Sequence, residues 1–225
     1  MSKILVEVED LKTYFPVKSG VFKKVTGHVH AVDGISFKVN EQETFALVGE
    51  SGCGKSTTGR SILRIIDPTS GKVTFDGNDV LMLSKDEMRK KRKDMQLIFQ
   101  NPYSSLNPRL TVKKLLEEPL ITHFEMTQKE MDEQVLWIMN KVGLSSDQLE
   151  RYPHQFSGGQ RQRISIARAI ISKPKFVVAD EPVSALDVSI QSQILNLLIE
   201  LQKELKLTYV FISHDLNVVR HISNS

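Results

Sequence analysis

Cysteine is almost absent from this 225-residue sequence, in which Cys53 is the single thiol. One cysteine excludes an internal disulfide framework and a zinc site built on cysteine ligands. Long apolar runs are also missing: none approaches the roughly twenty residues that cross a bilayer, and the N-terminal stretch MSKILVEVED lacks the apolar core of a secretory signal. The sequence therefore predicts a soluble, intracellular chain.

Strong charge of one sign is lacking as well. The formal net charge is +3 and the isoelectric point is near 8.9, which is too mild to indicate a nucleic-acid-binding protein. Acids interrupt and flank the basic run Arg89–Asp94, so a solvated helix face is favoured over a nucleic-acid patch. His28 and His30 alternate like a strand pair, and because no third metal ligand accompanies them we expect a solvated pair.

What the sequence does contain is a glycine-rich bend between an apolar strand pattern, Thr44–Val48, and a helical pattern that ends near residues 67–71. The bend, GESGCGKS, matches GxxxxGK[ST] at every fixed position. Its glycines allow successive N–H groups to form a nest for phosphate, beside the positive end of a helix expected to begin near Lys55. This pattern predicts a nucleoside triphosphate site. The residues expected to contact the nucleotide there are Gly49, Glu50, Ser51, Gly52, Cys53, Gly54, Lys55, Ser56 and Thr57.

The N-terminal third of the sequence has the patterns of an antiparallel sheet. Ile4–Val8 and Val29–Val39 alternate apolar and polar residues, which is typical of half-buried strands. The stretch between them, residues 15–27, is interpreted as a loop. Residues 72–80 predict a hairpin that turns at Asp76 and Gly77.

A helical region and two further strands follow. From Thr111 to Leu149 the periodicity is helical, with a capping box at Thr127 and Glu130. Phe176–Asp180 and Thr208–Ser213 are continuous apolar runs, as buried parallel strands are. Strands that alternate with helices indicate an α/β fold with a mostly parallel sheet. The helix between the last two strands places on one face Ile190, Ile194, Leu197, Leu198 and Leu201.

Two adjacent carboxylates end the first of these apolar strands. Asp180 lies at its carboxyl end, where an open α/β sheet places ligand-binding groups, and Glu181 follows directly. Phosphoryl transfer needs a metal ion to neutralise phosphate charge and a group to orient or deprotonate the attacking water. We therefore expect Asp180 to bind magnesium and Glu181 to act on the water, although an apolar strand ending in Asp-Glu is by itself a weak signal.

A second helix that opens with glycines indicates a family. Gly158 and Gly159 precede apolar residues at helical spacing, so another helix N-terminus is available to an anion. The segment Phe156–Gln160, FSGGQ, resembles the LSGGQ signature of ATP-binding-cassette (ABC) ATPases, with Phe in place of Leu. The resemblance covers nearly the whole chain and contains the family's motifs in order. These are the Walker A motif at Gly49–Ser56, the Q-loop Gln100, the signature, the Walker B residues Asp180 and Glu181, the D-loop Ser184–Asp187 and the switch histidine His214.

The resemblance implies a P-loop NTPase (RecA-like) core with a mostly parallel sheet, an N-terminal antiparallel β subdomain and an inserted α-helical signature subdomain. We expect residues 1–225 to form a single ABC nucleotide-binding domain. Residues 1–100 and 174–225 would then be the catalytic core, and residues 101–173 the helical subdomain. Because family members continue well beyond the switch histidine, we expect this chain to be truncated at its C-terminal end.

Roles for single residues also follow from the resemblance. Glu181, His214 and Gln100 are expected to be catalytic, with ATP as substrate and Mg²⁺ as the metal ion. Phe15 is favoured over its neighbour Tyr14 as the aromatic residue that stacks on adenine. Mg²⁺ is expected to be bound by Ser56, Gln100 and Asp180. Further contacts with the nucleotide, in a head-to-tail dimer with an identical or homologous ATPase, are expected from Ser157, Gly158, Gly159, Gln160 and Asp187.

Two stretches resemble the ATP-binding subunits of dipeptide and oligopeptide importers in particular, FQNPYSSLNPRLTV after the Q-loop and the long insertion near the N-terminus. Such a subunit acts at the cytoplasmic face of the cell membrane, as a peripheral protein. Its helical subdomain docks on transmembrane permease subunits, which implies Pro102, Tyr103 and Leu106 as contacts, and an extracellular solute-binding protein is an indirect partner.

Several alternatives remain open at this point. Related importers carry nickel or glutathione, and the substrate is chosen by the binding protein and the permease. A soluble ABC ATPase acting on DNA or ribosomes is disfavoured, because those proteins have paired cassettes or coiled-coil insertions that this sequence lacks. An exporter or lipoprotein-extraction ATPase is disfavoured by the long N-terminal insertion. No nucleic-acid partner is expected.

Overall fold

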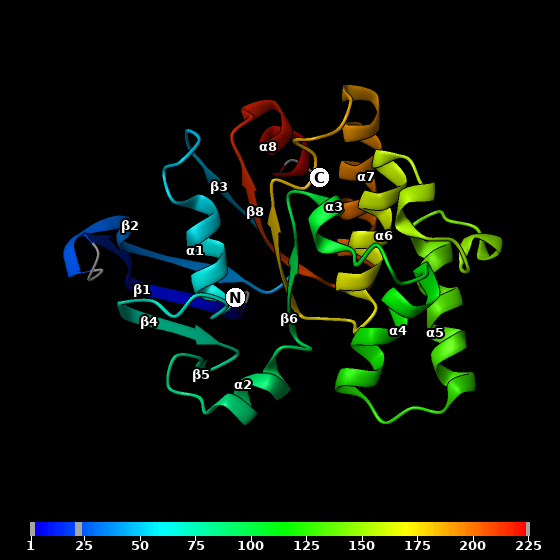
Figure 1. Cartoon of the computed structure of the whole chain (residues 1–225), viewed down its shortest axis with the longest axis horizontal. Helices are drawn as coiled ribbons and strands as arrows, with labels where there is room; N and C mark the ends of the chain where they lie inside the picture. The colour runs from blue at the N-terminus through cyan, green and yellow to red at the C-terminus, as the bar shows by residue number, and fades with distance from the viewer. Residues whose placement is uncertain (1–2, 21–23, 224–225) are drawn as a thin grey trace.

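The computed structural model describes residues 3–20 and 24–223, and within them two four-stranded sheets are flanked by helices (Figure 1). The first sheet is antiparallel, and its strand order is β2-β1-β4-β5. The second is parallel, and its order is β3-β8-β7-β6. The strands are β1 (Ile4–Ser19), β2 (Lys24–Asn40), β3 (Thr44–Val48), β4 (Ser70–Phe75), β5 (Asn78–Asp79), β6 (Met95–Ile98), β7 (Phe176–Asp180) and β8 (Thr208–Ser213).

The antiparallel sheet confirms the predicted strands but corrects the predicted loop. Residues 15–19 belong to β1 and residues 24–27 to β2, and the two strands pair there, with Phe15 opposite Val29 and Lys18 opposite Val25. Residues 21–23 lie outside the described part of the chain. The sequence pattern missed the pairing because most side chains there are exposed on both faces, so hydrogen bonds of the backbone form the ladder without an alternation of burial.

The hairpin at Asp76 and Gly77 is confirmed. Both residues have positive φ, 46° and 77°, which is the backbone of the tight turn that twists with its strands.

The parallel sheet has the predicted strand boundaries at β3, β7 and β8. Every residue of β7 and β8 is buried, which is why these strands are mostly apolar and show no alternation of apolar and polar residues. All neighbouring pairs in this sheet are parallel, so the carboxyl ends of β3, β7 and β8 lie at one edge.

Helix α1 (Lys55–Ile62) starts where the sequence predicts but ends earlier than residues 67–71. Leu63 leaves the helical conformation and Arg64 has φ 49°, so the chain turns back toward β4. The helix lies close against the sheet at Gly59, where a Cβ would be 2.7 Å from Val178 Cγ1. Glycine is needed at this crossing.

The helices after β6 form the right-hand side of Figure 1. Capping boxes begin α5 at Thr127 and Glu130, as predicted, and α6 at Ser157 and Gln160. The elements are α3 (Pro102–Ser105), α4 (Val112–His123), α5 (Gln128–Lys141), the 3-10 turns η1 (Ser146–Gln148) and η2 (Pro153–Gln155), and α6 (Gly158–Ile170).

Two hydrophobic clusters hold the fold together. One joins α4, α5 and α6 to one face of the parallel sheet, α7 (Val188–Leu205) and α8 (Leu216–Ser223). The other lies between the antiparallel sheet, α1, α2 (Lys85–Lys91) and the opposite face of the parallel sheet. Within the described ranges, no helix combines the length and the apolar character needed to span a membrane.

Candidate nucleotide-binding and hydrolysis site

The glycine-rich bend forms a loop closed by Lys55. Gly54 has φ 94°, and a Cβ on it would be 1.9 Å from the carbonyl oxygen of Ala31 in β2. Only glycine fits this position. Lys55 Nζ donates to the carbonyl oxygens of Gly49 at 2.8 Å and Glu50 at 2.6 Å, so a nearly buried ammonium spans the bend. A triphosphate entering the loop would be a stronger acceptor for this ammonium than the two carbonyls.

Asp180 and Ser56 make a polar pair with one unused acceptor. Ser56 Oγ donates to Asp180 Oδ1 at 2.6 Å, and Asp180 is 1% exposed. Its other oxygen, Oδ2, is buried and has no hydrogen bond among the described residues, with Arg60 Nη2 3.6 Å away. Burial raises the pKa of the Asp180 carboxyl, against the opposing effect of the Ser56 hydrogen bond. A buried, half-satisfied carboxylate beside a hydroxyl is a donor set that suits Mg²⁺.

Glu181 turns away from Asp180 and meets two other predicted residues. Its φ of 46° breaks the extended backbone of β7. Glu181 Oε2 accepts a hydrogen bond from Gln100 Nε2 at 2.9 Å and lies 3.2 Å from His214 Nδ1. Gln100 follows β6, Glu181 follows β7 and His214 follows β8. Residues separated by up to 114 positions therefore meet because their strands are neighbours in the parallel sheet.

These groups border one cleft of about 1080 Å³. Its volume is suited to a nucleotide. Ala31, Asn101, Tyr103, Ser184 and Ala185 border the cleft although the sequence did not indicate them as nucleotide contacts. The predicted residues on its wall are Glu50, Ser51, Gly52, Gly54, Lys55, Ser56, Thr57, Gln100, Glu181 and His214.

Other predicted contacts lie beside or behind this wall. The Gly49 carbonyl oxygen accepts a hydrogen bond from Lys55. Cys53 is exposed. Asp180 is hydrogen-bonded to Ser56, which borders the cleft. Phe15 is 39% exposed and is not among the residues that border the cleft. Tyr14 is already engaged, since its ring stacks on His30 at 4.0 Å between centroids and its hydroxyl bonds to Asp33.

The signature residues are not brought to this cleft. Among the described residues on its wall, none belongs to Ser157–Gln160 or is Asp187. They lie instead where α6 and α7 begin side by side: a Cβ on Gly159 would be 2.6 Å from Ile190 Cγ2. Ser157 and Asp187 are the N-caps of these two helices. The N-terminus of the signature helix α6 is therefore separate from the chain's own cleft.

The expected contacts after the Q-loop need a correction. Pro102 and Leu106 are buried, so neither is available to a partner on the surface. Tyr103 is 64% exposed, but its ring borders the cleft and stacks on the Arg161 guanidinium at 4.0 Å. The sequence could not separate these three residues because burial in so short a helix, α3, depends on how it packs against α6.

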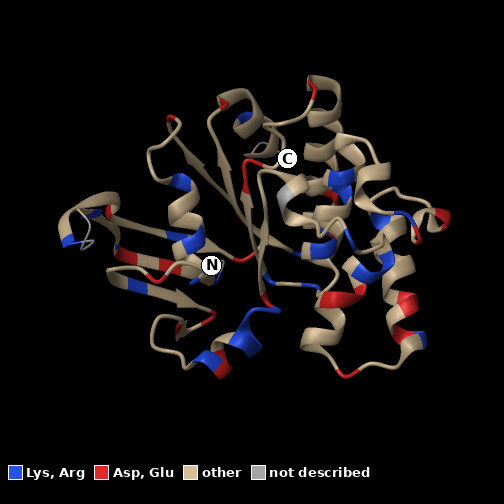
Figure 2. Cartoon of the chain, in the orientation of Figure 1, with Lys and Arg blue, Asp and Glu red and all other residues tan. Residues whose placement is uncertain are grey.

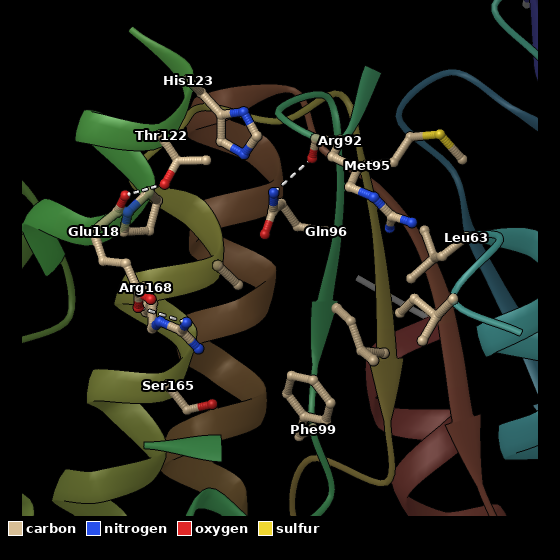
Figure 3. A pocket seen from close by; sticks show the side chains of 14 residues that line it. Leu63, Arg92, Met95, Gln96, Phe99, Glu118, Thr122, His123, Ser165 and Arg168 are labelled. Carbon is tan, nitrogen blue, oxygen red and sulfur yellow. Dashed lines mark hydrogen bonds and ion pairs between the residues drawn. The ribbon is translucent and has the colours of Figure 1, made fainter. Parts of the chain in front are cut away.

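A separate groove of about 320 Å³ lies elsewhere on the protein (Figure 3). It runs along β6, the edge strand of the parallel sheet, and is closed by α4 and α6. Arg168 and Glu118 form an ion pair of 2.8 Å within it. We call it the docking groove; its apolar lining is Leu63, Ile65, Met95, Leu97, Phe99 and Ala169, and its polar lining includes Arg92, Gln96, Thr122, His123 and Ser165.

Comparison with known proteins gives consistent results. The family model described as "ABC transporter" matches residues 32–184. The chain is 53% identical over 221 residues to the oligopeptide transport ATP-binding protein AppF of Bacillus subtilis, covering 98% of this chain and 67% of that protein. It is also 51% identical to the glutathione import ATP-binding protein GsiA of Pectobacterium atrosepticum, over 98% of this chain but 35% of that protein.

A solved structure with the same arrangement is the dimeric post-hydrolysis state of the ATP-binding cassette MJ0796 bound to ADP and Pi. Its TM-score is 0.84 at 32% identity, covering 96% of this chain and 90% of that chain.

Proposed function

The chain belongs to the ABC transporter family, and on this premise we propose that it binds and hydrolyses ATP to power a membrane importer of dipeptides or oligopeptides. The observation that carries the ATPase assignment is the meeting of Gln100, Glu181 and His214 beside the loop that holds Lys55. Phosphate binding and water activation are thus available at one cleft.

The cleft residues divide the work of hydrolysis. Lys55 and the loop N–H groups would bind the β and γ phosphates, which replace the two carbonyls that Lys55 now contacts. Mg²⁺ would be held by Ser56 and Asp180, with the Gln100 side-chain oxygen as a further ligand, and would neutralise charge on the transferred phosphoryl group. Glu181 would orient and deprotonate the attacking water, and His214 would hold the Glu181 carboxylate in place.

A second ATPase chain would complete the site. Ser157–Gln160 and Asp187 lie away from the chain's own cleft, and a helix N-terminus capped by serine can bind an anion supplied by another molecule. The dimeric MJ0796 cassette supports this arrangement. We propose a head-to-tail dimer in which each nucleotide lies between the cleft of one chain and the signature of the other, so that hydrolysis opens the dimer.

The docking groove is where a transmembrane permease subunit would bind. An amphipathic helix fits a groove whose floor is apolar and whose rim carries Arg92, Glu118 and Arg168. This contact would hold the chain at the cytoplasmic face of the membrane, and the solute-binding protein would reach it only through the permease.

The assignment of peptides as the transported substrate is the more specific part of the proposal. Relatives named for dipeptide and oligopeptide transport support it, for example DppF of Haemophilus influenzae at 53% identity. The glutathione relative is almost as similar, so identity alone does not separate the two substrate classes. Uptake of labelled di- and oligopeptides by cells carrying the intact operon, with and without this gene, tests the substrate; unchanged peptide uptake with lost glutathione uptake would reassign it.

The ATPase assignment is tested with Glu181→Gln. This change keeps size and hydrogen bonding but removes the basic carboxylate, so the variant should bind Mg-ATP normally and lose turnover by about a hundredfold or more. Binding is measured by calorimetry and turnover by phosphate release. Glu200→Gln, a neutralised carboxylate at an exposed position of α7 outside the cleft, is the matched control and should retain activity. Undiminished turnover in Glu181→Gln would place the base elsewhere.

A further inference from the structure

A second hollow, which we call the basic cleft, adjoins the docking groove. It measures about 390 Å³ and lies between α2 with its following turn and the C-terminal end of α4. In Figure 2 much of the ribbon of α2 and of the turn after it is blue, the colour of lysine and arginine. The basic cleft and the docking groove share Thr122 and His123 in their linings, so the two hollows are neighbours. The residues that line the basic cleft are Asp86, Arg89, Lys90, Lys93, Thr122 and His123.

The positive charge of the basic cleft is not neutralised within the protein. In the part of the chain that the structure describes, Arg89, Lys90 and Lys93 form no ion pair. Lys93 is placed over the ring of Phe124, with 5.7 Å between Nζ and the centroid. Asp86 is the acid on the wall of the cleft.

The positive charge of the basic cleft also affects the pKa of His123. Burial lowers the pKa of its imidazole, and Arg89, Lys93 and Arg92 lower it further, while Asp94 opposes them. The effect of these three cations on the imidazole indicates a positive potential at His123, which favours an anion.

Exposed apolar side chains lie close in the chain to these cations and to the docking groove. Met82, in the turn that precedes α2, is 81% exposed, and Ile121, next to Thr122 in α4, is 65% exposed. Ile65, on the wall of the docking groove, is 47% exposed. Long cationic side chains mixed with exposed apolar ones are typical of surfaces that lie at the boundary between lipid headgroups and acyl chains.

We propose that the basic cleft binds the phosphate groups of anionic phospholipids, so that α2 rests on the membrane surface beside the docked permease. Arg89, Lys90 and Lys93 would contact headgroup phosphates, and Met82 and Ile121 would enter the interface. The orientation rests on the proposed function, because the groove that would receive the permease shares Thr122 and His123 with this cleft. A lipid is favoured over an acidic protein segment because it offers both a phosphate for the cations and an apolar phase for exposed side chains such as Met82.

The test is co-sedimentation of the purified chain with vesicles that contain no protein. Vesicles of phosphatidylcholine with about one third phosphatidylglycerol should bind the chain at low salt, and pure phosphatidylcholine should not. Binding should weaken steeply between about 50 and 300 mM NaCl. The triple variant Arg89→Gln, Lys90→Gln and Lys93→Gln should bind about a hundredfold more weakly, since each basic residue contributes about fivefold.

A matched variant separates this site from net charge. Lys18→Gln, Lys24→Gln and Lys203→Gln remove the same charge from exposed positions on β1, β2 and α7. This control should bind vesicles like the wild type. Lys90→Arg with Lys93→Arg keeps the charge and should also bind normally, and circular dichroism and calorimetric ATP binding verify that each variant is folded.

Three results would overturn the proposal: equal binding to neutral and anionic vesicles, equal loss in the triple variant and its control, or no binding to any vesicle. If the triple variant binds vesicles normally but loses permease in pull-down, the cleft serves an acidic protein segment instead. Failure of the proposed function is seen separately, as lack of ATP hydrolysis with the permease while vesicle binding persists.

Discussion

At the residue scale, two neighbouring acids acquire different chemistry from their surroundings. Asp180 continues β7, stays buried and accepts a hydrogen bond from Ser56. Glu181 adopts a left-handed backbone, so its carboxylate faces Gln100 and His214. Carboxylates in different environments take different roles, one suited to a metal ion and the other to a water. The backbone turn at Glu181 therefore determines where its carboxylate lies, and hence the role that this side chain can take.

The conformation of the loop that holds Lys55 depends on the glycine at position 54. Gly54→Ala should disturb it, because the new Cβ would lie 1.9 Å from the Ala31 carbonyl oxygen and the backbone would have to move. We expect the free energy of unfolding to fall by about 1–3 kcal/mol and ATP affinity to fall markedly. Denaturant unfolding and calorimetry measure the two effects.

Gly52→Ala is the control for this prediction. Gly52 also has a positive φ, 84°, but no described atom lies within 4 Å of the place that a Cβ would occupy there. An alanine at position 52 would therefore have the same kind of backbone strain as one at position 54, but no steric clash. Equal losses in the two variants would show that strain, rather than contact with β2, governs the loop.

At the element scale, the position of α1 against the parallel sheet aligns the phosphate loop with the strand ends. The contact is made at Gly59, above Val178 in β7 and Ile212 in β8. Since β7 carries Asp180 and β8 leads to His214, any tilt of α1 changes the distance between the loop and both residues.

Gly59→Ala should test this packing. The added Cβ would lie 2.7 Å from Val178 Cγ1 and 3.0 Å from Ile212 Cδ1, so we expect a loss of about 1–3 kcal/mol in unfolding free energy, partly offset by better helix propensity. Thermal unfolding and ATP affinity should both decline. Gly27→Ala in β2 would meet no described atom within 4 Å and should be neutral; a stabilised Gly59→Ala would contradict the tight crossing.

A second contact between secondary-structure elements is ionic. Asp76, in the β4–β5 turn, accepts from Lys3 at 2.7 Å and from Lys175 at 2.6 Å, which joins the starts of β1 and β7. The hydrogen bonds from Lys175 and Lys3 lower the pKa of Asp76 from 3.8 to about 2. A lowered pKa means that the ionised form stabilises the fold above the unfolded pKa.

Asp76→Asn should therefore cost about 1–2 kcal/mol of unfolding free energy at neutral pH, after allowance for solvent screening of the exposed lysines. The difference from the wild type should shrink as pH falls from about 4 toward 2, where the aspartate becomes protonated. Asparagine tolerates the positive φ of this turn. Urea titrations at several pH values measure the effect, and a difference that does not depend on pH would exclude an ionic origin.

At the scale of the whole molecule, the proposed shared site predicts that turnover requires two chains, because no described residue of the signature borders the cleft. Binding and hydrolysis should then have different dependence on protein concentration. ATP affinity belongs to one chain, whereas the rate per chain should rise with concentration as dimers form.

Mixing two inactive variants provides a sharper test. Lys55→Ala removes the cation of the cleft and Ser157→Ala removes the cap of the signature helix, so neither homodimer contains a complete site. A mixed dimer keeps one site intact, and random pairing should restore about a quarter of the wild-type rate. Phosphate release with light scattering tests this; dimers that form in the mixture without regaining activity would refute the shared site.

Much of the fold could be predicted because its signals are local. The strand β3, the boundaries of β7 and β8, the capping box at Thr127 and the start of α6 follow from short-range periodicity and capping chemistry. The pairing of residues 15–19 with residues 24–29 could not be predicted, because it uses backbone groups and leaves the side chains exposed.

The sequence by itself determined the phosphate loop, its lysine and the helix that follows, since all of these lie within a few residues of one another. Only the tertiary structure decided that Gln100, Glu181 and His214 meet, because the order β3-β8-β7-β6 places three distant strand ends side by side. It also decided that Pro102 and Leu106 are buried and that the docking groove and the basic cleft share Thr122 and His123. Periodicity reports which side of an element is apolar, whereas surfaces between elements arise from long-range packing.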